Sequence, residues 1–309
     1  MAKISTISDY LLGFPEDART FPSSTPSKHY RYGQEPYFQE SLRSFKSSFP
    51  DVIKQSRNYT YVLIKPDAFV ARQAAAVIKA VTGRGFRVVA LEEFTFDRMM
   101  VRELWRYEFN AANVARYRLI DSLLCSGPSL MAILEGPIGT FDSSQTLSAL
   151  KGPSLLKDRT PDCIRNEINA RTGTLNFIHT PDETIDFVRE LGVLFDDATR
   201  ARVLESMVVG KEVQAASSLE KIDKISSNYP KHTLLLDDVE KYLDPTFQKF
   251  VADNERALTI DPYIVFDELN EKFQFGIWDW VTLVNETLMF GYSDIPRVFQ
   301  FECELDECS

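Results

Sequence analysis

The stretch LNFIHTPDET (175–184) carries a short apolar run straight into His179, and a turn and a helix start follow it. A second apolar run, YVLIKPDAF (61–69), leads into the tripeptide Lys-Pro-Asp that begins at Lys65. Two strands that end in a lysine and in a histidine can place a cation beside a nucleophile. That pairing suits phosphoryl transfer, because charge stabilisation and positioning do most of the work in that reaction.

Hydrophobic periodicity around these two runs predicts a βαββαβ order. Strands are expected at 59–64, 86–96, 130–134 and 175–178. Helices are expected at 69–82, 97–109, 114–124, 143–150 and 182–191. This order is the ferredoxin-like arrangement, an α+β fold in which an antiparallel sheet carries helices on one face.

Six short motifs follow one another in this part of the chain. They are IKPD (64–67), GRGFRVV (83–89), SGPSLMAILEGP (126–137), PDCIR (161–165), NFIHTPD (176–182) and ELGVLF (190–195). In this order and spacing, the region from 59 to 195 resembles a nucleoside diphosphate kinase domain. The resemblance covers less than half of the 309 residues. It implies a ferredoxin-like fold and a phosphotransferase activity.

The resemblance also implies roles for individual residues. His179 matches the histidine that the family phosphorylates, Glu190 the carboxylate that orients it, and Lys65 a phosphate-binding lysine. A neutral imidazole accepts phosphate near pH 7 without a large shift of its pKa, which fits the role of His179. A lone histidine at a strand end is more often a satisfied polar residue, so the surrounding motifs carry this assignment.

Further matches concern the nucleotide. Arg165 corresponds to an arginine whose forked guanidinium binds the phosphates, and Asn176 to an asparagine that contacts the ribose. Tyr117 falls where the family stacks a phenylalanine on the base, although an aromatic residue on such a helix is more often core. Neither a GxxxxGK[ST] nor a GxGxxG phosphate loop occurs in the chain.

The chain departs from the family pattern in the phosphate site. Where a second phosphate-binding arginine is expected, the chain offers Ser144 or Gln145, and where a threonine is expected it offers Leu150 or Lys151. The loop at 153–161 is longer by about three residues and adds two cations. We expect either that these cations and Lys151 replace the missing charge, or that the donor site has changed.

Two smaller departures lie near the nucleophile. Phe109 stands where the family has a tyrosine beside the histidine, and Pro181 stands where it has a serine. Losing one charge-assisted phosphate contact costs about 1.5–3 kcal/mol, or roughly ten- to a hundredfold in rate. Slow or redirected chemistry is therefore expected.

Three hypotheses remain open. The first is a phosphotransferase that passes the γ-phosphate of a nucleotide through His179 to a nucleoside diphosphate or a related acceptor. The second is a nucleotide-binding scaffold that acts through the C-terminal part of the chain. The third is a different nucleotide reaction on the same fold, because a fold does not fix a function.

Charge and composition divide the chain into three parts. Residues 1–57 are rich in Ser, Pro and aromatic residues and predict an extension that covers a neighbouring surface. Residues 58–197 form the expected kinase-like domain, and 198–309 an acidic, mainly helical module. The last 110 residues hold 21 acidic and 11 basic side chains, so they carry the whole net charge of −10. Nucleic acid is therefore not expected as a partner of this module.

The remaining expectations concern location and ligands. The chain has no run of 18 apolar residues and no secretory start, and its four cysteines form no CxxC pair, which favours a cytoplasmic protein without a membrane segment or a structural metal. The family resemblance implies Mg²⁺ carried by the nucleotide. It also implies a homodimer or a higher oligomer, and the acidic module is a candidate site for a protein partner.

Overall fold

The computed structural model describes residues 16–107, 114–171, 173–235 and 274–289, together with five single positions between 239 and 271. Its centre is a four-stranded sheet. The strands are β1 (Tyr59–Ile64), β2 (Arg87–Thr95), β3 (Pro128–Glu135) and β4 (Ile178–His179). They lie in the order β2-β3-β1-β4, and all neighbouring pairs are antiparallel. The predicted ferredoxin-like α+β fold is confirmed.

The pairing of β1 with β4 determines where the candidate nucleophile lies. Leu63 pairs with His179 and Ile64 with Ile178, so the histidine lies beside the end of β1. The next residue, Lys65, donates its backbone N–H to the carbonyl of Phe177 at 2.9 Å. Phe177 has a positive φ of 66°, which ends regular extension before β4. The strand is therefore shorter than the predicted run 175–178.

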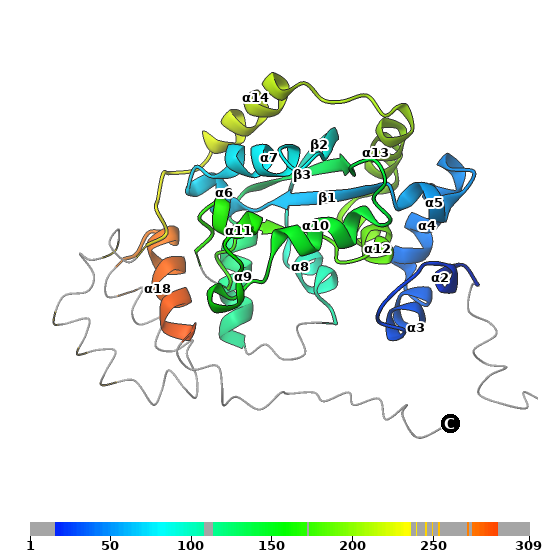
Figure 1. Cartoon of the computed structure of the whole chain (residues 1–309). Helices are drawn as coiled ribbons and strands as arrows, with labels where there is room; N and C mark the ends of the chain where they lie inside the picture. The colour runs from blue at the N-terminus through cyan, green and yellow to red at the C-terminus, as the bar shows by residue number, and fades with distance from the viewer. Residues whose placement is uncertain are drawn as a thin grey trace, which may run out of the picture.

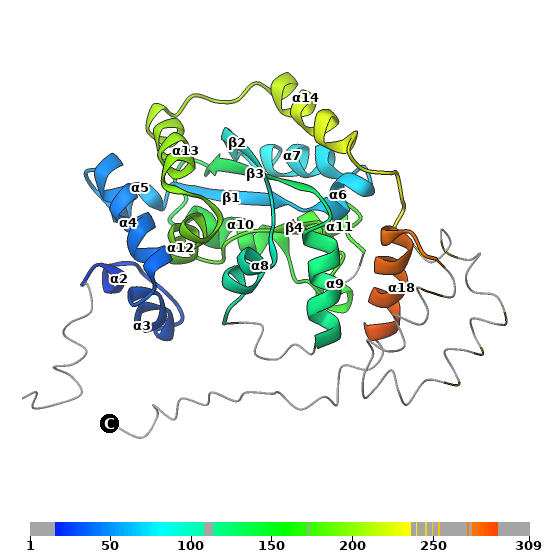
Figure 2. The same ribbon diagram turned by 180° about the vertical axis from the view of Figure 1, so that it is seen from behind.

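Helices cover both faces of the sheet. Figure 1 shows α7 (Ala74–Thr82), α10 (Ser143–Lys151) and α11 (Ile164–Glu167) on the near face. Figure 2 shows α8 (Arg98–Leu104), α9 (Val114–Leu124), α12 (Thr184–Leu194) and α13 (Asp197–Val209) on the other. The expectation of helices on one face is wrong, because all six residues of β1 are buried and such a strand needs cover on both sides.

The N-terminal segment packs against the second of these faces. It contains α2 (Glu16–Thr20), α3 (Ser27–Gly33), α4 (Pro36–Ser48) and α5 (Val52–Ser56). Helix α4 lies against α12 and α13 and buries Phe38 and Phe45 completely. The approach is close at Gly192, where a Cβ atom would lie only 2.1 Å from the carbonyl oxygen of Tyr37.

The described C-terminal residues follow the edge and one end of the domain. Helix α14 (Ala215–Ser226) lies against α7 and the short α6 (Pro66–Val70), and α18 (Ile277–Met289) packs against α9. The backbone N–H of Val213 bonds to the carbonyl of Val88 at 2.8 Å, and the Lys221 ammonium bonds to that of Leu91 at 2.8 Å. These contacts satisfy carbonyl groups of β2, the edge strand.

Two sequence-based expectations concern the rest of this region. The apolar periodicity of the C-terminal part also predicts helices at 232–242, 245–254 and 265–271. Residues 232–235 are described and are not helical, so the first of these helices does not begin where expected, and the other two lie mostly outside the described residues. Within the part of the chain that the structure describes, no helix combines the length and the apolar character needed to span a membrane.

Candidate functional site

His179 is held by a carboxylate of the following helix. Its Nε2 atom lies 3.1 Å from Oε2 of Glu190, which is carried by α12. The Trp105 ring meets the imidazole edge-on with ring centroids 5.3 Å apart. A carboxylate at Nε2 favours the tautomer that carries its hydrogen there, which leaves a lone pair on Nδ1.

A second donor reaches the same carboxylate oxygen. The Tyr61 hydroxyl donates to Oε2 of Glu190, and the Tyr61 side chain is completely buried in β1. Burial, followed by the charge of Glu190, raises the pKa of Tyr61 well above its ordinary value. The hydroxyl therefore stays protonated and remains a donor. In the sequence, Tyr61 and Trp105 looked like ordinary apolar positions.

A cleft of about 260 Å³ opens in front of His179. Its polar lining includes Lys65, Lys151, Arg165, Asn176, Thr180 and Asp182. Its apolar lining includes Trp105, Ile120, Leu123, Leu124 and Ile178. A cleft with one apolar wall and several converging polar groups is typical of small-molecule sites.

Three cations in the cleft are almost fully buried. Lys65, Lys151 and Arg165 are 5, 8 and 5% exposed. Burial lowers the pKa of both lysines, and it lowers that of Arg165 to about 10 with a contribution from nearby Arg159. Such desolvated cations attract a phosphate more strongly than surface cations do.

Backbone carbonyls hold two of these cations in place. The Lys65 ammonium donates to the Thr174 carbonyl at 3.0 Å and lies 3.6 Å from the Asp67 carboxylate. Arg165 donates to the carbonyls of Gly152 at 2.6 Å and Ile178 at 3.2 Å. Its buried Nε–H has no partner among the described residues.

Asp67 and Asn176 shape the turn that delivers the histidine. The fully buried Asp67 carboxylate accepts the backbone N–H of Phe177 at 3.0 Å, which supports the positive φ of that residue. Asn176 donates from its side-chain amide to the Gly173 carbonyl at 2.6 Å and lines the cleft. The turn is thus fixed from both sides.

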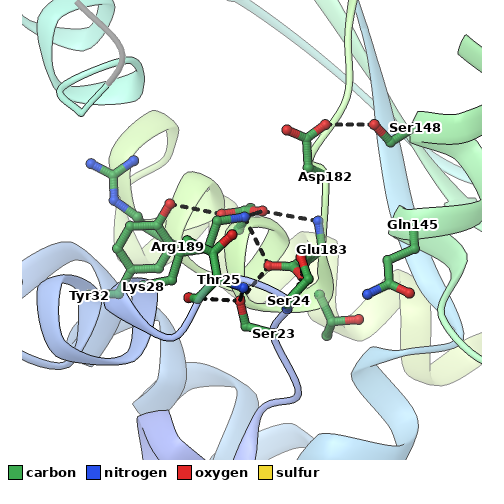
Figure 3. A network of polar contacts seen from close by, with 12 residues as sticks. Ser23, Ser24, Thr25, Lys28, Tyr32, Gln145, Ser148, Asp182, Glu183 and Arg189 are labelled. Carbon is green, nitrogen blue, oxygen red and sulfur yellow. Dashed lines mark hydrogen bonds and ion pairs between the residues drawn. The ribbon is translucent and has the colours of Figure 1, made fainter. Parts of the chain in front are cut away.

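Lys151 reaches a carboxylate at the mouth of the cleft. Its ammonium lies 3.4 Å from Oδ1 of Asp182, which also accepts the Ser148 hydroxyl at 2.6 Å (Figure 3). Against the effect of burial, Lys151 and Ser148 lower the pKa of Asp182. Lys151, which lies on the same helix as Ser144 and Gln145, is therefore paired with an exposed acid.

Several predicted residues do not line this cleft. Tyr117 lines a second hollow with Arg98 and Arg118, where the Arg102 guanidinium lies over its ring at 4.6 Å. Phe109 lies outside the described residues.

The two added cations of the long loop are also elsewhere. Lys157 is exposed in the 3-10 turn η2 (Leu156–Asp158). Arg159 donates to loop carbonyls, including those of Ser154 at 2.8 Å and Ala170 at 2.6 Å. Neither lines the cleft, so only Lys151 of the three cations considered as replacements lies there.

The N-terminal segment fixes the start of α12 (Figure 3). Ser23 and Ser24 hydrogen-bond to Glu183, and the Lys28 ammonium lies 2.9 Å from Glu183 and 2.6 Å from Asp186. Against the effect of burial, these donors lower the pKa of Glu183 to about 2. The helix that presents Glu190 is thus anchored by residues more than 150 positions away in sequence.

A buried ion pair also attaches the N-terminal segment to α12. Arg189 is 1% exposed, and its Nε atom lies 2.5 Å from Oε2 of Glu35. The same guanidinium donates to the carbonyls of Leu104 and Glu103 at the end of α8. The Tyr107 hydroxyl also donates to Glu35, at 2.5 Å. One carboxylate of the N-terminal segment therefore joins α12 to the chain after α8.

Among the described residues, no three His, Cys, Asp or Glu side chains gather closely enough to hold a metal ion. The contacts described above instead bring His179 into one cleft with three buried cations.

Comparison with known proteins shows that the domain is similar to one family, although the chain spans less than half the length of the first relative it matches. A family model described as "Nucleoside diphosphate kinase" matches residues 58–199. Human thioredoxin domain-containing protein 6 is 31% identical over 152 residues, which cover 47% of this chain and 44% of that protein. A nucleoside diphosphate kinase of Sulfolobus acidocaldarius is 29% identical over 140 residues, which cover 45% and 91%. A solved nucleoside diphosphate kinase from Encephalitozoon cuniculi matches 45% of this chain and 90% of its own, with 17% identity and a TM-score of 0.40.

Proposed function

We propose that the nucleoside diphosphate kinase-like domain at residues 58–199 moves the γ-phosphate of a nucleoside triphosphate through His179 to a nucleoside diphosphate or a related nucleotide. The family match supports nucleotide phosphotransfer at the level of the family. The observation that carries the finer proposal is the orientation of His179 by Glu190 at the floor of a cleft with three buried cations.

The first half-reaction uses the lone pair on Nδ1 of His179. Nδ1 attacks the γ-phosphorus, the bond to the β–γ bridging oxygen breaks, and the nucleoside diphosphate leaves with that electron pair. Positive charge grows on the imidazole, and the carboxylate of Glu190 at Nε2 stabilises it. The second half-reaction reverses these steps with a new diphosphate.

The buried cations stabilise the leaving group and the transferred phosphoryl. Lys65 and Arg165 enter the cleft from the residues after β1 and from α11, and both are positioned before the substrate arrives. Preorganised charges in a low-dielectric site need no reorganisation when the charge develops. Mg²⁺ enters as part of the nucleotide substrate.

The apolar wall suits the base and gives it little selectivity. Trp105, Ile120 and Leu123 contribute mostly carbon surface to the cleft, and only the indole N–H of Trp105 among these side chains can form a hydrogen bond. We therefore expect several nucleoside triphosphates to act as donors, with modest differences among them.

The alternative is a nucleotide-binding scaffold. It is favoured by the second arginine that is missing from the phosphate site and by the acidic C-terminal part of the chain. In that case the cleft binds nucleotide without transfer, and the covered edge of β2 marks the domain as a platform for the C-terminal residues.

Labelling with γ-³²P Mg-ATP distinguishes the phosphotransferase from the nucleotide-binding scaffold. The chain has three histidines, so His179→Asn is compared with the matched variants His29→Asn and His232→Asn. We expect acid-labile, base-stable label that His179→Asn abolishes, that both controls keep, and that nucleoside diphosphates remove. Nucleotide binding without any label would refute the phosphotransferase and leave the scaffold.

A further inference from the structure

The Tyr61 hydroxyl shares its acceptor with the nucleophile. Oε2 of Glu190 receives both the Tyr61 O–H and Nε2 of His179, the latter at 3.1 Å. Tyr61 is completely buried and is not among the residues that line the cleft. The hydroxyl therefore acts on the carboxylate and not on the nucleotide.

The surroundings of Glu190 explain why a second donor is needed. Asp186 precedes it by one helical turn on α12 and adds a second negative charge on the same side. Lys28 and Tyr32 of the N-terminal segment bind Asp186, and the Arg189 guanidinium is directed to Glu35. Among the described residues, Tyr61 is the donor outside the imidazole that hydrogen-bonds to Glu190.

We propose that Tyr61 is a positioning residue of the phosphohistidine step, which fixes the Glu190 carboxylate so that Nε2 of His179 keeps its hydrogen and Nδ1 faces the phosphate. This inference rests on the proposed function. Without the hydroxyl, Oε2 has one donor, and the carboxylate rotates away from the repulsion of Asp186. The imidazole then spends less time in the reactive tautomer and orientation.

Packing alone is the competing explanation for Tyr61. Its ring lies near those of Phe187 and His179, with centroids 6.2 and 6.0 Å away. Tyr61→Phe keeps the ring and removes only the hydroxyl. Tyr59→Phe is a matched control, because Tyr59 lies on the same strand and its hydroxyl donates to the Met207 carbonyl at 2.6 Å, away from Glu190.

The test is a double-mutant cycle on the single-turnover rate of phosphohistidine formation. We expect Tyr61→Phe to slow this step about 10- to 100-fold with the affinity for ATP unchanged within about twofold, and Tyr59→Phe to leave the rate unchanged within about twofold. In a Glu190→Ala background, Tyr61→Phe should change the rate less than about twofold. Equal effects in both backgrounds, or a wild-type rate for Tyr61→Phe, overturn the proposal.

A spectroscopic measurement tests the effect of Tyr61 on the His179 tautomer independently of phosphotransfer. In protein labelled with ¹⁵N-histidine, the His179 signals are assigned by their loss in His179→Asn, and they report which ring nitrogen carries the hydrogen. We expect the hydrogen on Nε2 in the wild type and in Tyr59→Phe, and a mixture of tautomers in Tyr61→Phe. If the wild type forms no label but the tautomer changes as expected, only the phosphotransferase fails. An unchanged tautomer in Tyr61→Phe overturns the role of Tyr61 whatever the labelling shows.

Discussion

Glu35→Ala is expected to be among the most damaging single changes in the N-terminal segment. The substitution leaves the Arg189 guanidinium, which is 1% exposed, without its carboxylate partner. Two backbone carbonyls still accept from Arg189, but they carry no compensating charge. The Tyr107 hydroxyl loses its acceptor as well.

Removing one partner of a buried ion pair costs about 3–5 kcal/mol, because the other charge stays buried. With a urea slope of about 3 kcal/mol per M, this lowers the midpoint of unfolding by roughly 1–1.7 M. Replacing both partners, as in Glu35→Leu with Arg189→Met, should cost much less, because no charge is left unpaired.

Urea unfolding followed by tryptophan fluorescence measures these differences. Glu167→Ala is a suitable control, since its ion pair with Arg84 at 2.6 Å is partly exposed and is worth at most about 1 kcal/mol. If Glu35→Ala costs no more than Glu167→Ala, the attachment of the N-terminal segment to α12 does not depend on this ion pair, and the argument from burial is refuted.

Three further changes have defined outcomes. Lys65→Met should lower kcat/KM for nucleotide phosphotransfer by roughly 10- to 100-fold, because it removes a buried cation that we propose binds phosphate; an unchanged kcat/KM would contradict that role. Gly192→Ala should destabilise the protein by about 1–3 kcal/mol and speed tryptic cleavage within 16–57, because its Cβ meets the backbone of Tyr37; unchanged cleavage would contradict the close packing of α4. Burial, followed by the charge of Glu190, raises the pKa of Asp186 to about 6. Between pH 4 and 6 the folded state therefore binds more protons than the unfolded state, and the free energy of unfolding falls as pH rises, by at most about 1.4 kcal/mol per pH unit. Asp186→Asn should flatten this slope in urea titrations between pH 4 and 6, and an equally steep slope would show that another group titrates.

Much of the fold could be predicted because the strands and helices follow from local patterns of apolar, polar and turn residues. Alternation and turn residues predicted a strand at 86–96, and β2 spans Arg87–Thr95. The order of strands and helices then left few topologies open. The faces that the helices cover could not be predicted in the same way, because they depend on which long-range surfaces meet.

Part of the candidate site could also be predicted from local sequence. His179, Lys65 and Arg165 stand at strand ends and in a short helix next to turns, and the structure brings them to one cleft with Lys151 and Asn176. Their roles remain predictions that the labelling experiment tests.

Other assignments depended on how elements are placed relative to each other. Tyr117 lines a second hollow, which the sequence did not predict. Hydrophobic periodicity identifies the apolar side of α9, but it does not say which side of that helix faces the cleft. Tyr61 and Trp105 looked like core residues, since a single aromatic in an apolar run carries no local sign of a partner.

The sequence by itself determined the sheet, the charged residues at its ends and the concentration of negative charge in the last 110 residues. Only the tertiary structure decided which groups orient the histidine and what holds α12. Lys28 lies 158 positions from Asp186, and Tyr61 lies 129 positions from Glu190. Contacts over such separations arise from packing of the whole chain, because hydrogen bonds between buried groups depend on three-dimensional proximity and leave no periodic trace along the sequence.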